Sequence, residues 1–275
     1  RSDAEVRAHL HAENAYTEAV LAPVQPLMDT LYAEMLGRLK QDDASVPVRH
    51  RGYWYQSHYE PGKQYPIYTR RVDVHGMPGP DAQLLLDCNV LAAGYAFFQL
   101  GSYEVSPDNR LLAYTVDTVG RRQYALRVLN LVTGELLPDS IENIEPGVAW
   151  TDDLRILYVE KDPVTLLGRR VRVHRLGTEA VADELIYEEP DESFDLVVER
   201  SKSERFLYIG AESTTSSEWL YAPADASRLD FKVFLPRSPD HEYEIEHVGD
   251  EFIVRTNWQA ENFRIMSVPI GEEQN

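Results

Sequence analysis

The stretch Tyr103-Glu-Val-Ser-Pro-Asp-Asn-Arg-Leu-Leu-Ala-Tyr-Thr-Val-Asp117 decides the fold that this sequence predicts. Its two ends are rich in Val, Leu, Tyr and Thr, which suit a pleated strand. Between them lies Ser106-Pro107-Asp108-Asn109, and Pro followed by Asp and Asn is typical of a tight turn. The stretch therefore predicts a strand, a turn and a second strand.

The same pattern recurs along the chain. Thr151–Tyr158 and Ser201–Tyr208 each combine a polar turn, an arginine and an apolar strand, and Val248–Val254 is a weaker copy. The turns begin at 106, 151, 201 and 248, at intervals of 45, 50 and 47 residues. A period in the forties with only strand-like segments is typical of the four-stranded blades of a β-propeller. Chance similarity between hairpins of another all-β fold is the alternative.

We therefore predict an all-β chain, a β-propeller of about five four-stranded blades with an N-terminal α-helical arm. The arm occupies 1–46 and the partial propeller 47–275. The predicted blades lie at about 47–90, 95–137, 144–188, 193–235 and 240–275. The last blade stops before its outer strand, so we expect the sequence to be a fragment and the propeller to be incomplete.

The arm has the spacing of helices. Ser2 or Asp3 can cap a first helix, and Pro23 and Pro26 interrupt it. A second helix is expected from about Pro26 to Lys40, and its apolar residues are four apart. They are Leu27, Leu31, Met35 and Leu39. We expect this apolar stripe to be core, with the arm packing on another part of the protein.

Composition excludes several classes of partner. The formal net charge is −19, which argues against binding nucleic acid or an anionic membrane surface and is compatible with a cationic partner. Cys88 is the single cysteine, which excludes a disulfide within the chain and favours the cytoplasm. We expect it to be a small buried hydrophobe. The longest apolar run, Val90–Phe98, is too short to span a bilayer.

No catalytic, cofactor-binding or metal-binding residues emerge from the motifs. No serine lies in a Gly-x-Ser-x-Gly motif, and the nearest, Ser102 after Gly101, is expected to be an ordinary strand serine. His241-Glu242 lacks the second histidine of a zinc helix. His9 and His11 are two apart on a predicted helix and therefore point to different faces. We expect no catalytic residue, no cofactor and no metal in this chain.

Two further groups of residues have a structural and a functional interpretation. The acidic run 188–192 is either a solvated loop, which we favour, or a source of negative potential that attracts basic peptides. The tryptophans are expected to pack within blades rather than to bind ligands. They are Trp54, Trp150, Trp219 and Trp258.

Several stretches together resemble one family of peptidases. Ala12-Glu-Asn-Ala-Tyr-Thr-Glu18 resembles the N-terminal helix of the prolyl oligopeptidase family. Glu60-Pro-Gly-Lys-Gln-Tyr-Pro66 is similar to part of its first propeller blade, and Leu129-Asn-Leu-Val-Thr-Gly-Glu135 to part of its second. Lys40-Gln-Asp-Asp43 with Ser45-Val-Pro47 points to the oligopeptidase B branch, also called protease II.

The resemblance implies a serine peptidase with a seven-bladed propeller and a C-terminal α/β-hydrolase domain that carries a Ser-Asp-His triad. The oligopeptidase B branch cleaves short peptides after Arg or Lys, and the propeller excludes larger substrates. This chain holds no hydrolase domain, so we expect it to be inactive by itself and to have that domain and short basic peptides as partners. The alternatives are a free-standing propeller-like binding module without catalysis, and an enzyme with paired carboxylates. We also expect the open arc to self-associate or to pack against its own arm.

Overall fold

The computed structural model describes residues 3–273 and begins with the helical arm. Helix α1 (Ala4–Leu21), the 3-10 turn η1 (Ala22–Val24) and helix α2 (Gln25–Gly37) form it. Asp3 caps α1, because its Oδ1 accepts hydrogen bonds from the amides of Glu5 at 2.9 Å and Val6 at 3.1 Å. Ser2, the other candidate cap, lies outside the described residues.

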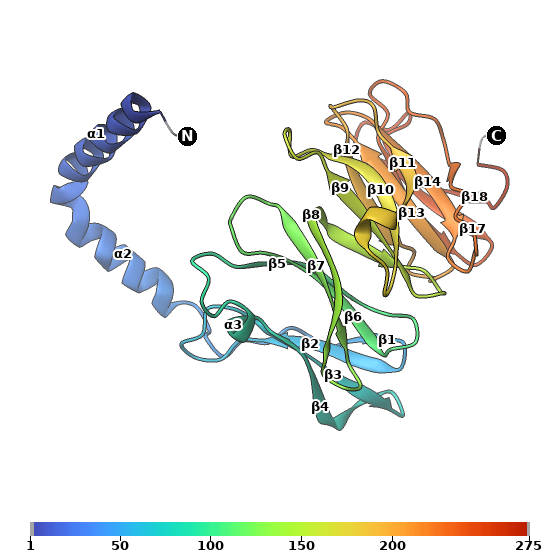
Figure 1. Ribbon diagram of the computed structural model, residues 1–275, viewed down its shortest axis with the longest axis horizontal. Coiled ribbons are helices and arrows are strands. Elements are labelled where there is room, and N and C mark those ends of the chain that lie inside the picture. The colour runs from blue at the N-terminus through green and yellow to red at the C-terminus, as the bar shows by residue number, and fades with distance from the viewer. Residues whose placement is uncertain (1–2, 274–275) are drawn as a thin grey trace.

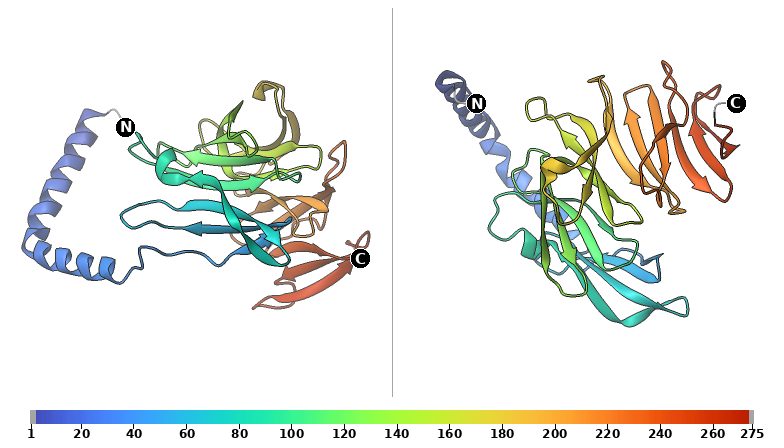
Figure 2. Two further views of the ribbon diagram at one scale, coloured as in Figure 1. Left: turned by 90° about the horizontal axis from the view of Figure 1, so that it is seen from below. Right: turned by 45° about the vertical axis from the view of Figure 1, so that its right-hand side comes forward.

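The arm stands apart from the sheets in Figure 1 and in the left-hand view of Figure 2. Every described residue before β1 is exposed, including Leu31 and Met35. The expectation that the apolar stripe is core is therefore wrong for the described residues, whereas packing of the arm on something outside this chain stays a prediction. The helical spacing correctly predicted helices, but it could not say whether a partner surface lies within the same chain.

Four antiparallel sheets follow the arm. The first contains β1 (Val48–His50), β2 (Tyr53–His58), β3 (Ile67–Val74) and β4 (Met77–Asp87), after which comes the short helix α3 (Cys88–Leu91). The second contains β5 (Gln99–Val105), β6 (Leu111–Asp117), β7 (Tyr124–Asn130), β8 (Leu136–Trp150), β9 (Arg155–Lys161), β10 (Gly168–Arg175) and β11 (Glu184–Glu188). A 3-10 turn, η2 (Ala180–Ala182), precedes β11.

The third sheet contains β12 (Asp195–Arg200), β13 (Phe206–Glu212), β14 (Ser217–Pro223) and β15 (Lys232–Val233), and the fourth β16 (Tyr243–Val248), β17 (Glu251–Thr256) and β18 (Arg264–Pro269). The sheets fan out side by side in the right-hand view of Figure 2. This is the predicted β-propeller arrangement.

Strand β8 is longer than the sequence suggested. We predicted separate blades at about 95–137 and 144–188, but one strand of 15 residues runs from the end of the first into the second. Its first part pairs with β7 and its second part with β9, and the pairing with β9 shifts register between Ile144 and Val148. It is therefore both the outer strand of the second blade and the inner strand of the third, and it joins the two into one seven-stranded sheet.

The recurring turn has the same hydrogen bonds in three copies. A buried hydroxyl begins each turn and accepts from the amide that starts the next strand. The pairs are Ser106 Oγ with Leu111 N at 2.9 Å, Thr151 Oγ1 with Arg155 N at 2.9 Å, and Ser201 Oγ with Phe206 N at 3.0 Å.

The fourth position of each of these turns is left-handed: φ is 62° at Asn109, 62° at Leu154 and 64° at Glu204. The weaker copy differs, because Val248 pairs directly with Glu251 across a shorter turn that contains Gly249. The sequence pattern thus identified a real structural repeat and ranked its copies correctly.

The hydrophobic core is divided among the spaces between neighbouring blades. Strand β9 shows how one strand serves two of these spaces. Leu157 and Val159 pack toward the fourth blade, whereas Ile156 and Tyr158 pack toward the second. All four are at most 2% exposed. Burial on both faces explains why β9 is a continuous apolar run rather than an alternating one.

Several smaller predictions can be compared with the structure. Cys88 is 1% exposed, as expected, and burial raises the pKa of its thiol to about 11. Trp150 and Trp219 are buried between blades, whereas Trp258 is 49% exposed and stacks beneath Arg264, so the packing prediction is wrong for it. No helix within residues 3–273 has the length and apolar character needed to cross a membrane.

Candidate functional site

The first strands of successive blades lie on the inner side of the arc. We call this inner side the channel. It is formed by β5, the second half of β8, β12 and β16; β5 and β12 both contact β8. The Ser102 hydroxyl donates to the Pro146 carbonyl at 2.6 Å, and the Trp150 indole donates to the Glu104 carbonyl at 2.9 Å. Ser102 is thus a structural serine, as predicted.

Gly101 makes this close packing possible. A Cβ at Gly101 would lie 2.5 Å from Thr115 Oγ1 and 2.7 Å from Pro146 Cβ. Any side chain there would push β5 away from the inner strand of the third blade. The pair Gly101-Ser102 therefore belongs to the strand contact and not to a nucleophile motif.

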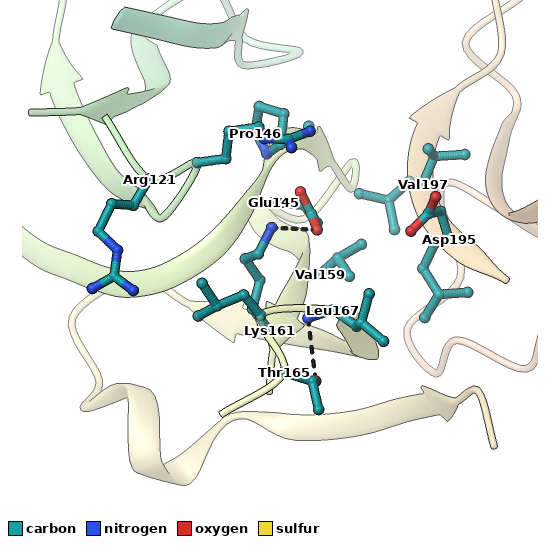
Figure 3. Close-up of a pocket in the computed structure, with 14 residues that line it drawn as sticks. Arg121, Glu145, Pro146, Val159, Lys161, Thr165, Leu167, Asp195 and Val197 are labelled. Atoms are coloured by element: carbon teal, nitrogen blue, oxygen red, sulfur yellow. Dashed lines mark hydrogen bonds and ion pairs between the residues drawn. The ribbon is translucent and has the colours of Figure 1, made fainter. Parts of the chain in front are cut away.

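A cavity of about 540 Å³ opens where the channel part of β8 and strand β12 begin (Figure 3). This size is typical of sites that hold small molecules or a few peptide residues. Glu145 and Lys161 lie in its middle, with Asp195 and Val197 of β12 facing them from the other side. The remaining charged lining residues are Arg121 and Arg122, and the wall is otherwise largely apolar.

An ion pair fixes the centre of this cavity. Lys161 Nζ lies 2.6 Å from Glu145 Oε1, and the Lys161 side chain is only 6% exposed. Gly168 leaves room for this carboxylate, because a Cβ there would lie 3.0 Å from Glu145 Cγ. Since Lys161 is neutralised by Glu145, it is not a free cation for a substrate.

The loop that carries the two arginines is held by a buried carboxylate. Asp117 accepts hydrogen bonds at 2.7–2.9 Å from four consecutive amides, Val119 to Arg122. Burial alone would raise the pKa of Asp117, but these four donors lower it. The loop is therefore held by hydrogen bonds from its backbone amides to the Asp117 carboxylate. These bonds place Arg121 and Arg122 at the cavity edge.

Carboxylates gather along the fourth and fifth blades. Glu199 on β12, Glu212 on β13 and Glu244 on β16 influence one another: burial and the neighbouring negative charges raise the pKa of Glu199 and Glu212. Glu244 is partly neutralised by Arg255 at 3.2 Å. This cluster leaves no pattern in the sequence, because its members come from three different strands of two blades.

Glu104 on β5 is the most perturbed carboxyl. Glu104 is exposed to solvent, and it also lines two cavities. Burial raises its pKa to about 7, against the opposing effect of Arg51 and Arg200. It lines a second cavity of about 310 Å³ together with Arg51, Glu199 and Arg200.

Two of the four carboxylates in the acidic run 188–192 are paired with arginines, whereas Asp191 and Glu192 are exposed. Glu189 is 1% exposed and lies 2.6 Å from Arg237, which also contacts Glu218 at 3.0 Å. Glu188 pairs with Arg170 at 3.0 Å. The run therefore joins the third blade to the fourth through Glu189 and leaves Asp191 and Glu192 at the surface.

Within residues 3–273 there is one hydrogen bond between a serine and a histidine side chain. His247 Nδ1 lies 2.7 Å from Ser203 Oγ, but Nε2 of this histidine has no hydrogen-bond partner. A catalytic pair needs a third group that orients the histidine, so this contact is structural. No cluster of His, Cys, Asp and Glu suited to a metal ion occurs in the described part of the chain. The cavities and carboxylates described here are suited to binding a ligand and to attracting one of positive charge.

Comparison with known proteins identifies the family to which this architecture belongs. The family model described as "Prolyl oligopeptidase, N-terminal beta-propeller domain" matches residues 1–275. Dipeptidyl aminopeptidase BI of Pseudoxanthomonas mexicana is 51% identical over 98% of this chain and 39% of its own length. Protease 2 of Moraxella lacunata is 31% identical over 99% of this chain and 40% of its own length.

Solved structures show the same fold over the whole length of this chain. Oligopeptidase B from Leishmania major superimposes with a TM-score of 0.90 at 25% identity, over 100% of this chain and 39% of that one. Oligopeptidase B from Trypanosoma brucei, with bound antipain, gives a TM-score of 0.87 at 26% identity, with the same coverage. The chain thus spans about two fifths of the length of these relatives. The turn repeat, the fanned blades and these matches together show that the chain belongs to the prolyl oligopeptidase family, as its N-terminal β-propeller portion.

Proposed function

We propose that this chain is the substrate-facing propeller of a longer serine peptidase that hydrolyses short peptides after Arg or Lys. Its partners are then a C-terminal hydrolase domain that carries the Ser-Asp-His triad and short basic peptides. The family's peptidase assignment and the relatives named protease 2 and oligopeptidase B support this proposal. The chain by itself is then inactive, because the catalytic groups lie in the other domain.

The carboxylates on β5, β12 and β13 are the observation that carries the proposal. Glu104, Glu199 and Glu212 all have raised pKa values because burial and, in each case, other carboxylates disfavour their charged forms. A cationic peptide would relieve that repulsion, and carboxylates that lie close together attract ligands of the opposite charge. The net charge of −19 acts in the same direction.

The test uses the full-length protein and two matched peptide substrates, one with Arg and one with a neutral residue at the cleaved position. We expect kcat/KM for the Arg peptide to fall several-fold as salt rises from about 0.05 to 0.5 M, while the neutral peptide changes little, because salt screens charge steering. Glu199→Gln should weaken this salt dependence. Glu142→Gln, the same charge change in the second blade's Arg127 pair, is the control. Equal salt dependence for both peptides would contradict the steering role.

A second candidate is removal of dipeptides from peptide N-termini. It is favoured by the 51% identity to a relative named dipeptidyl aminopeptidase BI, which exceeds the 31% identity to protease 2. Fluorogenic substrates with free and blocked N-termini separate the two activities. Cleavage of the free form only would support dipeptide removal, and cleavage of both would support the oligopeptidase activity.

The third candidate is a binding module without catalysis. A serine-reactive phosphonate should label the full-length protein once and should not label residues 1–275 alone. If the full-length protein is not labelled and cleaves neither substrate, the peptidase proposal fails and the binding module remains.

A further inference from the structure

Arg121 and Arg122 bring positive charge to the edge of the 540 Å³ cavity without a carboxylate partner. Both residues are exposed, and both line the cavity. Within residues 3–273 neither guanidinium makes an ion pair or a hydrogen bond, and only the backbone amides of the two residues are bonded, to Asp117. A shortage of carboxylates does not explain this, because the sequence has 46 acidic and only 27 basic residues.

The carboxylates around this loop are already bonded. Asp117 is 0% exposed and accepts from four amides of the loop itself. Glu145 lies 2.6 Å from the ammonium of Lys161. Asp195 is the remaining carboxylate of the cavity, and it faces these residues from β12, on the other side (Figure 3). The charge of the two arginines is therefore available to an anionic ligand.

The two arginines hold different positions at the cavity edge. The side chain of Arg121 points away from Lys161 (Figure 3), so Arg121 adds charge to the edge rather than to the centre. Burial raises the pKa of Tyr124, and the charges of Asp117 and Glu145 raise it further, whereas the charge of Arg122 lowers it. Arg122 thus lies near enough to act on groups inside the cavity. We take it as the main contact.

The backbone at Arg122 is not one that an arginine favours. Its φ of 53° lies in the left-handed region, where glycine is the least strained residue. The preceding residue but one, Gly120, also has a positive φ, of 81°. The loop thus holds an arginine at a position where its own turn would favour glycine, and strain of this kind is found at sites that bind ligands.

The rest of the lining suits the end of a peptide chain. Val159, Leu166, Leu167 and Leu196 give the cavity an apolar wall beside the arginines. A guanidinium binds a carboxylate through two parallel hydrogen bonds, which makes arginine the usual partner of such a group. A peptide with a free C-terminus carries a carboxylate next to its last side chain. The edge and the wall together therefore match the two groups that such an end presents.

We propose that Arg122, assisted by the charge of Arg121, binds the C-terminal carboxylate of a short peptide at this cavity. The subsite rests on the proposed function, whose substrates are short peptides, and it adds a group that a good substrate must carry. Glu104 and Glu199 line the adjoining 310 Å³ cavity, which shares Gly147 with this one. A basic peptide then binds with a basic side chain near these glutamates and its C-terminus at Arg122, so the two signs of charge set its orientation.

The test measures binding by the full-length protein and does not depend on cleavage. Three peptides of equal length carry a dye on the N-terminus and contain no Arg or Lys. One ends in a free carboxylate, one in an amide, and one in an amidated glutamate. Fluorescence anisotropy gives each Kd. We expect the free acid to bind about fivefold more tightly than the amide, the size expected for one solvent-exposed ion pair, and Arg122→Gln to reduce this preference to within about twofold.

Arg110→Gln is the matched control. Arg110 is exposed like Arg122 and lies at the other end of β6, so this variant loses the same charge from the same blade and should keep the fivefold preference. Arg122→Lys keeps the charge and should retain part of it. Thermal unfolding checks that each variant keeps its fold.

Each outcome decides the proposal. Equal binding of the acid and the amide by the unmodified protein, or an equal loss of preference in the Arg110→Gln variant, overturns the subsite. Binding of the amidated glutamate peptide as tightly as the free acid overturns its assignment to the chain terminus, because a side-chain carboxylate would then serve as well. If the full-length protein cleaves no peptide, the proposed function fails, while these binding measurements still decide whether the subsite exists.

Discussion

Thr151 offers the sharpest test of the turn that repeats in this propeller. Its hydroxyl accepts from the Arg155 amide at 2.9 Å and donates to Asp153 Oδ1 at 2.6 Å. Thr151 is 0% exposed and Arg155 is 5% exposed. Thr151→Val keeps the shape of the side chain but leaves the Arg155 amide buried without an acceptor. An unsatisfied buried donor costs about 1–3 kcal/mol, so we expect a loss of about 2 kcal/mol in the free energy of unfolding.

Urea unfolding of the chain, followed by tryptophan fluorescence, measures this loss. Ser106→Ala and Ser201→Ala remove the equivalent hydroxyls and should cost a similar amount, because their acceptor distances are 2.9 Å and 3.0 Å. Thr165→Val is the control: its hydroxyl contacts Asp162 at 3.2 Å on an exposed turn, where a change within about 0.5 kcal/mol is expected. The reasoning is refuted if Thr151→Val is no more destabilising than Thr165→Val.

Two further predictions concern pH. Because burial raises the pKa of Glu104 to about 7 from an ordinary 4.5, its ionisation opposes folding increasingly as pH rises between these values. Glu104→Gln should therefore gain thermal stability relative to the unmodified chain at about pH 8 and not at about pH 4; an equal difference at both would show that charge is not the cause. For Glu189, burial alone would raise the pKa, but Arg237 and the Asp191 amide lower it. Its contribution is therefore present above about pH 4.5 and lost as pH falls through the lower, folded-state pKa. Glu189→Gln should destabilise at about pH 7 by more than at about pH 3, and a pH-independent loss in thermal melts would contradict this account.

The repeat was visible in the sequence because each blade closes its own hairpin with local groups. A turn residue, a left-handed position and the amide that starts the next strand lie within six residues of one another, as in Ser201–Phe206. Local hydrogen bonds of this kind leave a local pattern. The strand, turn and strand predicted within Tyr103–Asp117 are found as the end of β5, a turn and β6 for the same reason.

Contacts that join different blades leave no signal in the sequence. The continuous strand β8 depends on a register shift against β9, which apolar periodicity does not reveal. The acidic run 188–192 was expected to be a solvated loop, although Glu189 is buried because Arg237 approaches from 48 residues away. The helices of the arm were correctly expected, but their spacing did not predict that the apolar side chains stay exposed.

The sequence by itself thus determined the hairpin unit and its period, because both follow from short-range backbone geometry. It also showed that no serine lies in a Gly-x-Ser-x-Gly motif. Tertiary structure alone decided which carboxylates share the channel wall and which side chains meet across it. Glu104 and Glu199 are 95 positions apart in sequence, and Arg51 and Glu204 are 153 apart, yet each pair influences or contacts its partner. The physical reason is that the angle between blades, set by the packed cores between them, brings these side chains together, and no local pattern encodes that angle.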